Sequence, residues 1–192
     1  LKWIGMPKLS TYIGIWLDYP EDQKPATRIA FEKRSIQALF DQLPDVLFIN
    51  QRMHPNVINW MPLYWKGFEQ TTRFSYRLSL DLSVESLWEG LESRMRRAIK
   101  KSEKRFKVSV IETDDIEQFY RINKKTYDRQ RKSMNYTFDD VHRIDASAKD
   151  RDARQILIAM DDKQQVHAAI YLLWDSNTTY YLMGGADENL RH

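Results

Sequence analysis

The sequence predicts an α+β fold in which a central, mostly antiparallel sheet is flanked by helices. Near the C-terminus, three apolar runs (155–160, 166–174 and 178–183) are separated only by short segments of turn-forming residues. Connections this short join antiparallel neighbours. A strongly amphipathic segment over 83–106 precedes them and predicts a helix that packs by one face. Hydrophobic residues make up 42% of the chain and charged residues 30%, a balance typical of a globular protein.

The first 80 residues predict a small mixed region. β-branched and aromatic residues, alternation, helical spacing and proline breaks give its elements. In order, these are a strand over 11–19, a loop over 22–27, a helix over 31–43, a strand over 46–51, an irregular stretch over 52–70 and a strand over 74–82.

The segment 83–106 is the clearest helix in the sequence. Ser83 suits the N-cap, and Glu85 suits the positive end of the helix dipole. One arc of the helix collects the apolar positions Leu87, Trp88, Leu91, Met95, Ala98, Ile99, Ser102 and Phe106, which we expect to pack. The opposite side, called here the basic face, collects Arg94, Arg96, Arg97, Lys100, Lys101 and Lys104.

A strand over 107–112 and two more helices complete the pattern. We expect the first of these helices to be capped by Thr113 or Asp114, with Asp114 and Glu117 in capping-box spacing. Its apolar stripe is Ile116, Phe119, Tyr120 and Tyr127. A shorter helix begins near residue 137, and 145–154 predicts a loop or a frayed helix. The last strand reaches Gly184 and Gly185, which end a strand or let a ligand approach the backbone.

Several classes of protein are excluded by composition. The chain has no cysteine, which rules out disulfides, a thiolate nucleophile and Cys-ligated metals. The four histidines (His54, His142, His167 and His192) have no metal-ligand spacing, so we expect no metal site. No apolar run is long enough to span a membrane and no signal-peptide layout is seen, so we expect a cytoplasmic protein without stable membrane insertion.

Positive charge is concentrated in two places. Residues 94–107 hold eight Lys or Arg against Glu103, and residues 121–132 hold six against Asp128, although the whole chain is only +3. Two basic stretches on an otherwise acidic chain predict an anionic ligand.

The order and spacing of four segments resemble the FemAB-type branch of the GNAT acyltransferases, which includes peptidoglycan-bridge aminoacyltransferases. The match runs from about residue 65 to the end. The segments are Gly67-Phe68 with 76–83, Ser86-Leu-Trp-Glu-Gly-Leu with 94–104, Asp114-Asp-Ile-Glu-Gln-Phe-Tyr, and 168–174 with Tyr180-Tyr-Leu-Met-Gly-Gly-Ala-Asp.

The resemblance implies a GNAT-like fold, with a partial N-terminal subdomain over 1–80 and a second subdomain over 81–192. It also implies that an amine attacks an acyl-CoA, or an aminoacyl-tRNA, without a covalent enzyme intermediate. The splayed end of the last strand (Leu182, Met183, Gly184 and Gly185) would offer amides to the donor and to the oxyanion. In the family a donor-binding loop and helix follow this strand, and we expect the chain to stop before them.

The acceptor and the base are less defined. Arg94, Arg97, Lys100 and Lys101 are candidates to hold the phosphates of a small or nucleotide-linked acceptor, or of tRNA, and Tyr127 is a further substrate-binding candidate. Lys124, Lys125, Arg129, Arg131 and Lys132 are a second basic candidate. The proton acceptor stays open among Asp175, Asp187, His167 and Tyr127.

The leading hypothesis is an N-acyltransferase that acts on a cell-envelope or polysaccharide precursor. A nucleic-acid-binding module that uses the basic helix and a catalytically inactive GNAT scaffold are the alternatives.

Overall fold

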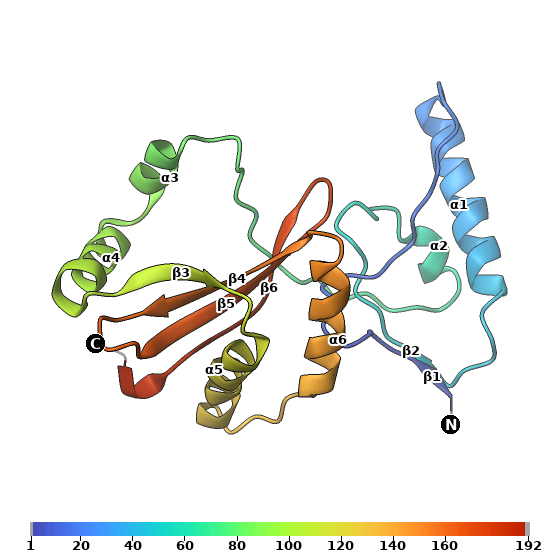
Figure 1. Ribbon diagram of the computed structural model, residues 1–192. Coiled ribbons are helices and arrows are strands. Elements are labelled where there is room, and N and C mark those ends of the chain that lie inside the picture. The colour runs from blue at the N-terminus through green and yellow to red at the C-terminus, as the bar shows by residue number, and fades with distance from the viewer. Residues whose placement is uncertain (1, 191–192) are drawn as a thin grey trace. The chain divides into compact units, whose positions relative to one another are not determined.

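A computed structural model describes residues 2–190 of the chain. The chain divides into two compact units, Leu1–Arg77 and Leu78–His192, each with most of its residue contacts inside the unit. The C-terminal unit holds a four-stranded antiparallel sheet with helices, the α+β architecture that the sequence predicts (Figure 1). Arg191 and His192 lie outside the described residues.

The N-terminal unit is built around one helix and a short pair of strands. β1 (Trp3–Ile4) pairs in parallel with β2 (Phe48–Ile49). Helix α1 (Pro25–Asp41) begins earlier than predicted, because Pro25 occupies the first turn of a helix instead of a loop. The short helix α2 (Met61–Tyr64) lies within the stretch predicted to be irregular.

Two predicted N-terminal strands are wrong. Residues 11–19 form only an isolated bridge, between Ile13 and Met53. Residues 74–82 form no strand, and their alternating apolar side chains are exposed, with Phe74 at 94% and Tyr76 at 102%. Alternation records a side-chain pattern, but a strand also needs a hydrogen-bonding partner, which this segment lacks in the described structure.

The predicted helix over 83–106 is two helices, α3 (Val84–Gly90) and α4 (Ser93–Phe106). Leu91 and Glu92 adopt extended backbone angles between them, after the poor helix former Gly90. The guanidinium of Arg96 donates to the carbonyls of Glu89 (2.6 Å) and Leu91 (2.9 Å) and so supports the break. Neither helix has a fully buried residue, but the predicted apolar face is half-buried at Leu87, Trp88, Ile99, Ser102 and Phe106, so this face packs only in part in the described chain.

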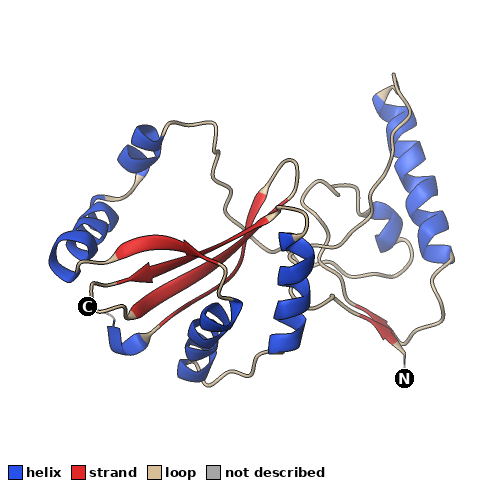
Figure 2. Ribbon diagram, viewed as in Figure 1, coloured by secondary structure: helices blue, strands red, loops and turns tan. Residues whose placement is uncertain are grey.

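The rest of the C-terminal unit follows the predicted order. The strands are β3 (Ser109–Thr113), β4 (Arg154–Met160), β5 (Val166–Trp174) and β6 (Thr179–Ala186), and they pair in that order. Helices α5 (Ile116–Arg129) and α6 (Phe138–Lys149) connect β3 to β4. Figure 2 shows the sheet in red, with these two helices beside it.

The core lies between the sheet and helices α5 and α6. Phe119 of α5 and Tyr171 of β5 are both fully buried, with ring centroids 5.6 Å apart. The Tyr171 hydroxyl donates to the buried Asp145 of α6 (3.1 Å). Both helices therefore pack on the sheet face that carries Tyr171.

The buried side chain of Arg154 joins β4 to α6 and to the start of α5 by two ion pairs. The Arg154 side chain is only 4% exposed and lies 3.0 Å from Asp145 and 2.7 Å from Asp114. Asp114 also pairs with Lys149. Since Asp114 makes these contacts, it is not the cap of α5: the cap is Asp115, which accepts from the Gln118 amide (2.8 Å).

Candidate functional site

The candidate active site is the outer edge of strand β6, where the strand is interrupted by a β-bulge. Met183 pairs with Tyr171 and Tyr181 with Leu172, so Leu182 is an extra, bulged residue. Strand β6 is the last strand of the described sheet, so its outer side carries no further strand. A bulge at a sheet edge re-aims backbone groups, and bulges are over-represented beside active sites.

Helix α5 is fastened to this edge just beyond the bulge. Asn123 Nδ2 donates to the Gly184 carbonyl (2.8 Å), and the Ala186 amide donates to Thr126 Oγ1 (3.0 Å). Lys125 forms an ion pair with Asp187. In an antiparallel strand the amide and carbonyl of one residue point to the same side. The Gly184 amide therefore lies on the outer edge with its carbonyl.

The two glycines serve different purposes. A Cβ on Gly185 would lie 2.4 Å from the Ile122 carbonyl oxygen and 2.5 Å from Asn123 Cα, so this glycine permits the close approach of α5. A Cβ on Gly184 would meet chiefly the Tyr181 hydroxyl. The pair does not end the strand, which continues to Ala186. At Gly185 a helix backbone occupies the space into which a Cβ would point, so the absence of a side chain there makes room for α5.

A chain of hydrogen bonds leads from Gly184 into the core. Asn123 is 1% exposed, and its Oδ1 accepts from the Tyr136 hydroxyl (2.7 Å). Tyr136 is itself 6% exposed, and its hydroxyl lies 3.4 Å from that of Tyr127, one helical turn after Asn123 on α5. Burial raises the pKa of Tyr136, so its phenol keeps its proton at physiological pH. Sequence reasoning singled out Tyr127 but missed Asn123, Thr126 and Tyr136.

Three of the four candidate proton acceptors are already engaged. The hydrogen bond from Lys125, with the Asn189 amide, lowers the pKa of Asp187. His167 places one ring nitrogen 3.1 Å from Asp161 and the other 3.3 Å from the Leu190 carbonyl. Asp175 accepts from the Asn177 and Thr178 amides (each 2.8 Å) at a turn. Tyr127 is the candidate that belongs to the network at Gly184.

The basic face of α4 is exposed. Lys100 lies 5.6 Å from the centroid of the Trp88 ring, and Lys101 lies 5.4 Å from that of Phe106. Within residues 2–190 no carboxylate pairs with Arg94, Arg97, Lys100 or Lys101, which are all exposed. Among the described residues, no hydrogen bond or ion pair links these four cations to β6. The structure thus leaves the cations available to an anion without joining them to the β6 edge.

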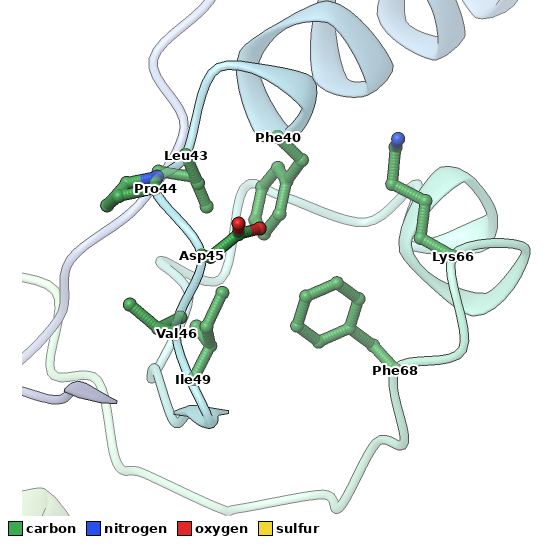
Figure 3. A pocket seen from close by; sticks show the side chains of 8 residues that line it. All are labelled: Phe40, Leu43, Pro44, Asp45, Val46, Ile49, Lys66 and Phe68. Carbon is green, nitrogen blue, oxygen red and sulfur yellow. The ribbon is translucent and has the colours of Figure 1, made fainter. Parts of the chain in front are cut away.

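A hollow of about 320 Å³ lies in the N-terminal unit (Figure 3). Its charged lining residues are Asp45 and Lys66, and Lys66 is already paired with Asp41. The other lining residues are Phe40, Leu43, Pro44, Val46, Ile49 and Phe68. The hollow carries no group suited to acyl transfer, and we assign it no function.

Neither a metal centre nor a spanning helix is found in the part of the chain that the structure describes. No three His, Cys, Asp or Glu side chains come together there as metal ligands would. None of its helices has the length and apolar character needed to cross a membrane.

A comparison with models of protein families gives a match. The model of a family described as "Acetyltransferase (GNAT) domain" matches residues 90–192, more than half of the chain. The matched range contains α4, α5, α6 and all four strands of the sheet. No curated protein matches the chain.

Proposed function

The chain belongs to the GNAT acetyltransferase family, and from that premise we propose that it transfers an acyl group from acyl-CoA to the amine of an anionic acceptor at the outer edge of β6. Acyl-CoA is the donor that acetyltransferases of this family generally use. The amine nitrogen attacks the thioester carbonyl, the new C–N bond forms, and the C–S bond breaks to release CoA. The amine gives up one proton, which ends on the released thiol or in water.

The observation that carries this proposal is the bulged edge at Leu182–Gly184. Stabilising the oxyanion requires a hydrogen-bond donor that is already aimed at the site where negative charge develops. The Gly184 amide points outward, and Asn123 and Thr126 hold the backbone on its C-terminal side. This preorganisation suits Leu182, Met183 and Gly184 for donor binding, with Gly184 supplying the outward amide and Gly185 admitting helix α5.

The basic face of α4 supports an acceptor that carries phosphate. Arg94, Arg97, Lys100 and Lys101 are exposed, and arginine in particular binds phosphate oxygens in pairs. We propose a nucleotide-linked amine, such as a precursor of the cell envelope or of a polysaccharide, as the FemAB-like resemblance implies. An aminoacyl-tRNA donor on the same face is the alternative within this reaction class.

The acceptor proposal is tested by reversing charge on this face. Arg97→Glu/Lys100→Glu should weaken the binding of UDP-glucosamine, an anionic amine probe, by at least tenfold at low salt. The control is Lys24→Glu/Lys163→Glu, which makes the same change in net charge at exposed positions elsewhere. Calorimetry would measure both affinities. Equal affinity of the two double variants for UDP-glucosamine would show that the basic face does not bind the acceptor.

A nucleic-acid-binding role is the second candidate, favoured by the same exposed cations. It predicts tight binding to random duplex DNA that falls steeply with salt and is lost in Arg97→Glu/Lys100→Glu. Binding of that kind, without thiol release from acetyl-CoA in the presence of a panel of amines, would favour this role over acyl transfer.

A further inference from the structure

Asn123 is a buried amide whose two ends are used for different partners. An amide in the core is costly unless both its donor and its acceptor are satisfied. Here Nδ2 reaches Gly184 on β6 and Oδ1 reaches Tyr136 in the connection between α5 and α6. The two contacts are 61 and 13 residues away along the chain. One side chain thus ties the sheet edge to that connection.

The direction of the hydrogen bonds follows from proton counting. A carbonyl only accepts, so the Gly184 carbonyl requires Nδ2 of Asn123 to face it, which turns Oδ1 towards Tyr136. A phenol has one proton, and Tyr136 gives its proton to Oδ1 at 2.7 Å. The longer 3.4 Å contact between the hydroxyls then takes its proton from Tyr127. The Tyr127 oxygen is left with lone pairs and no proton to offer elsewhere.

We propose that Asn123 and Tyr136 are positioning residues, which hold the Gly184–Gly185 peptide in place and keep the Tyr127 hydroxyl as a hydrogen-bond acceptor for the N–H of the attacking amine. This inference rests on the proposed function, because the amine is its substrate. It adds to that function by assigning the Tyr127 hydroxyl as the group that binds the N–H of the attacking amine. Half-buried Tyr127 lies one helical turn from Asn123, on the helix that is bonded to the β6 edge.

The backbone part of the inference has a test that needs no substrate. The chain has six glycines, so ¹⁵N-glycine labelling gives at most six amide signals. Asn123→Ala and Tyr136→Phe should each move the Gly185 signal more than the Gly14, Gly67 or Gly90 signals, because Gly185 donates the N–H of the peptide that Asn123 holds. Tyr64→Phe is the matched control, since it removes an exposed tyrosine hydroxyl from α2 in the N-terminal unit. A Gly185 signal that stays fixed in both variants would overturn the inference.

The role of Tyr127 is tested by kinetics of transfer from acetyl-CoA. We expect Tyr127→Phe and Tyr136→Phe each to lower kcat about tenfold, with the KM for acetyl-CoA unchanged, as expected when a positioned group is misoriented. If Tyr136 acts through Tyr127, the double variant should be no slower than Tyr127→Phe. If Tyr136→Phe slows the wild-type protein and Tyr127→Phe by the same factor, the inference is wrong.

The two proposals fail in different ways. A wild-type protein that transfers no acetyl group to any amine of the panel contradicts the proposed function and, with it, the role of Tyr127. The Gly185 signal still decides whether Asn123 holds the peptide in that case. If the wild-type protein transfers the acetyl group, and Tyr136→Phe slows the wild-type protein and the Tyr127→Phe variant by the same factor, only the inference is contradicted.

Discussion

Replacing Gly185 by alanine should separate α5 from β6. The added Cβ would lie 2.4 Å from the Ile122 carbonyl oxygen, and 2.5 Å from Cα and 2.8 Å from N of Asn123. All three are helix backbone atoms, which cannot swing aside as a side chain does. Ordinary contact begins near 3.4 Å, so the helix has to move by about 1 Å.

The size of this movement sets the expected loss in the free energy of unfolding. A 1 Å shift takes the Asn123–Gly184 and Thr126–Ala186 hydrogen bonds, now 2.8 and 3.0 Å, beyond bonding distance. Two lost hydrogen bonds cost about 2 kcal/mol together. Overpacking adds about 1–3 kcal/mol. Gly185→Ala should therefore lower the free energy of unfolding by about 3–5 kcal/mol, the sum of these costs.

Urea denaturation followed by far-UV circular dichroism measures this loss. With a slope of about 2 kcal/mol per molar, the midpoint should fall by about 2 M. Gly184→Ala is the matched control, because its Cβ meets chiefly the hydroxyl of the exposed Tyr181 side chain, which can move. A Gly185→Ala midpoint equal to that of Gly184→Ala would refute the reasoning.

Three further predictions concern the stability of the C-terminal unit. Arg154→Met should lower the free energy of unfolding by about 3 kcal/mol, because it leaves Asp145 buried without its cation. Arg143→Met removes a side chain that is 68% exposed and should change the free energy of unfolding by less than about 0.5 kcal/mol. Urea midpoints that match for the two variants would contradict this expectation. Thr137→Ala should lower the free energy of unfolding by about 1 kcal/mol, because it removes the capping box of α6. Thr137→Ser keeps the hydroxyl and should retain the wild-type stability in the same assay. Equal stability of these two variants would show that the hydroxyl does not cap the helix. Folding lowers the pKa of Asp187 below its usual value near 3.8. The ionised carboxylate therefore stabilises the folded protein at pH values above 3.8, and this contribution is lost as the pH falls through the folded-state pKa. The gap in unfolding free energy between the wild-type protein and Asp187→Asn should therefore narrow below pH 3.8, and a constant gap down to pH 2 would show that the carboxylate is not stabilised by folding.

The sheet and its order could be predicted from the sequence because their signals are local. Apolar runs separated by Asp-rich turns specify β4, β5 and β6, and short turns leave only antiparallel pairing. The start of α6 near residue 137 was likewise predicted from local sequence. Residues 74–82 show the limit of such signals, because their alternation fits a strand but the described chain supplies no partner.

The site could be predicted only in part. The run to Gly184 and Gly185 predicted the strand that carries the candidate site, but the spacing did not show that α5 occupies the space beside Gly185. Asn123 gave no signal in the sequence, because its amide acquires a role only when folding brings Gly184 and Tyr136 to it. The cap at Asp115 was missed for a related reason: Arg154, 40 residues away, holds Asp114 instead.

Removing the outward amide at Gly184 tests whether the β6 edge takes part in acyl transfer. Gly184→Pro deletes an N–H that points away from β5, so it removes no hydrogen bond of the β5–β6 ladder, and proline is tolerated at such edge positions. The measurement is the initial rate of CoA release from acetyl-CoA with an amine acceptor, for Gly184→Pro against Gly184→Ala. We expect the proline variant to release CoA at least about a hundredfold more slowly than the alanine variant, which keeps the amide. Equal rates for two folded variants would contradict a role for this edge in acyl transfer.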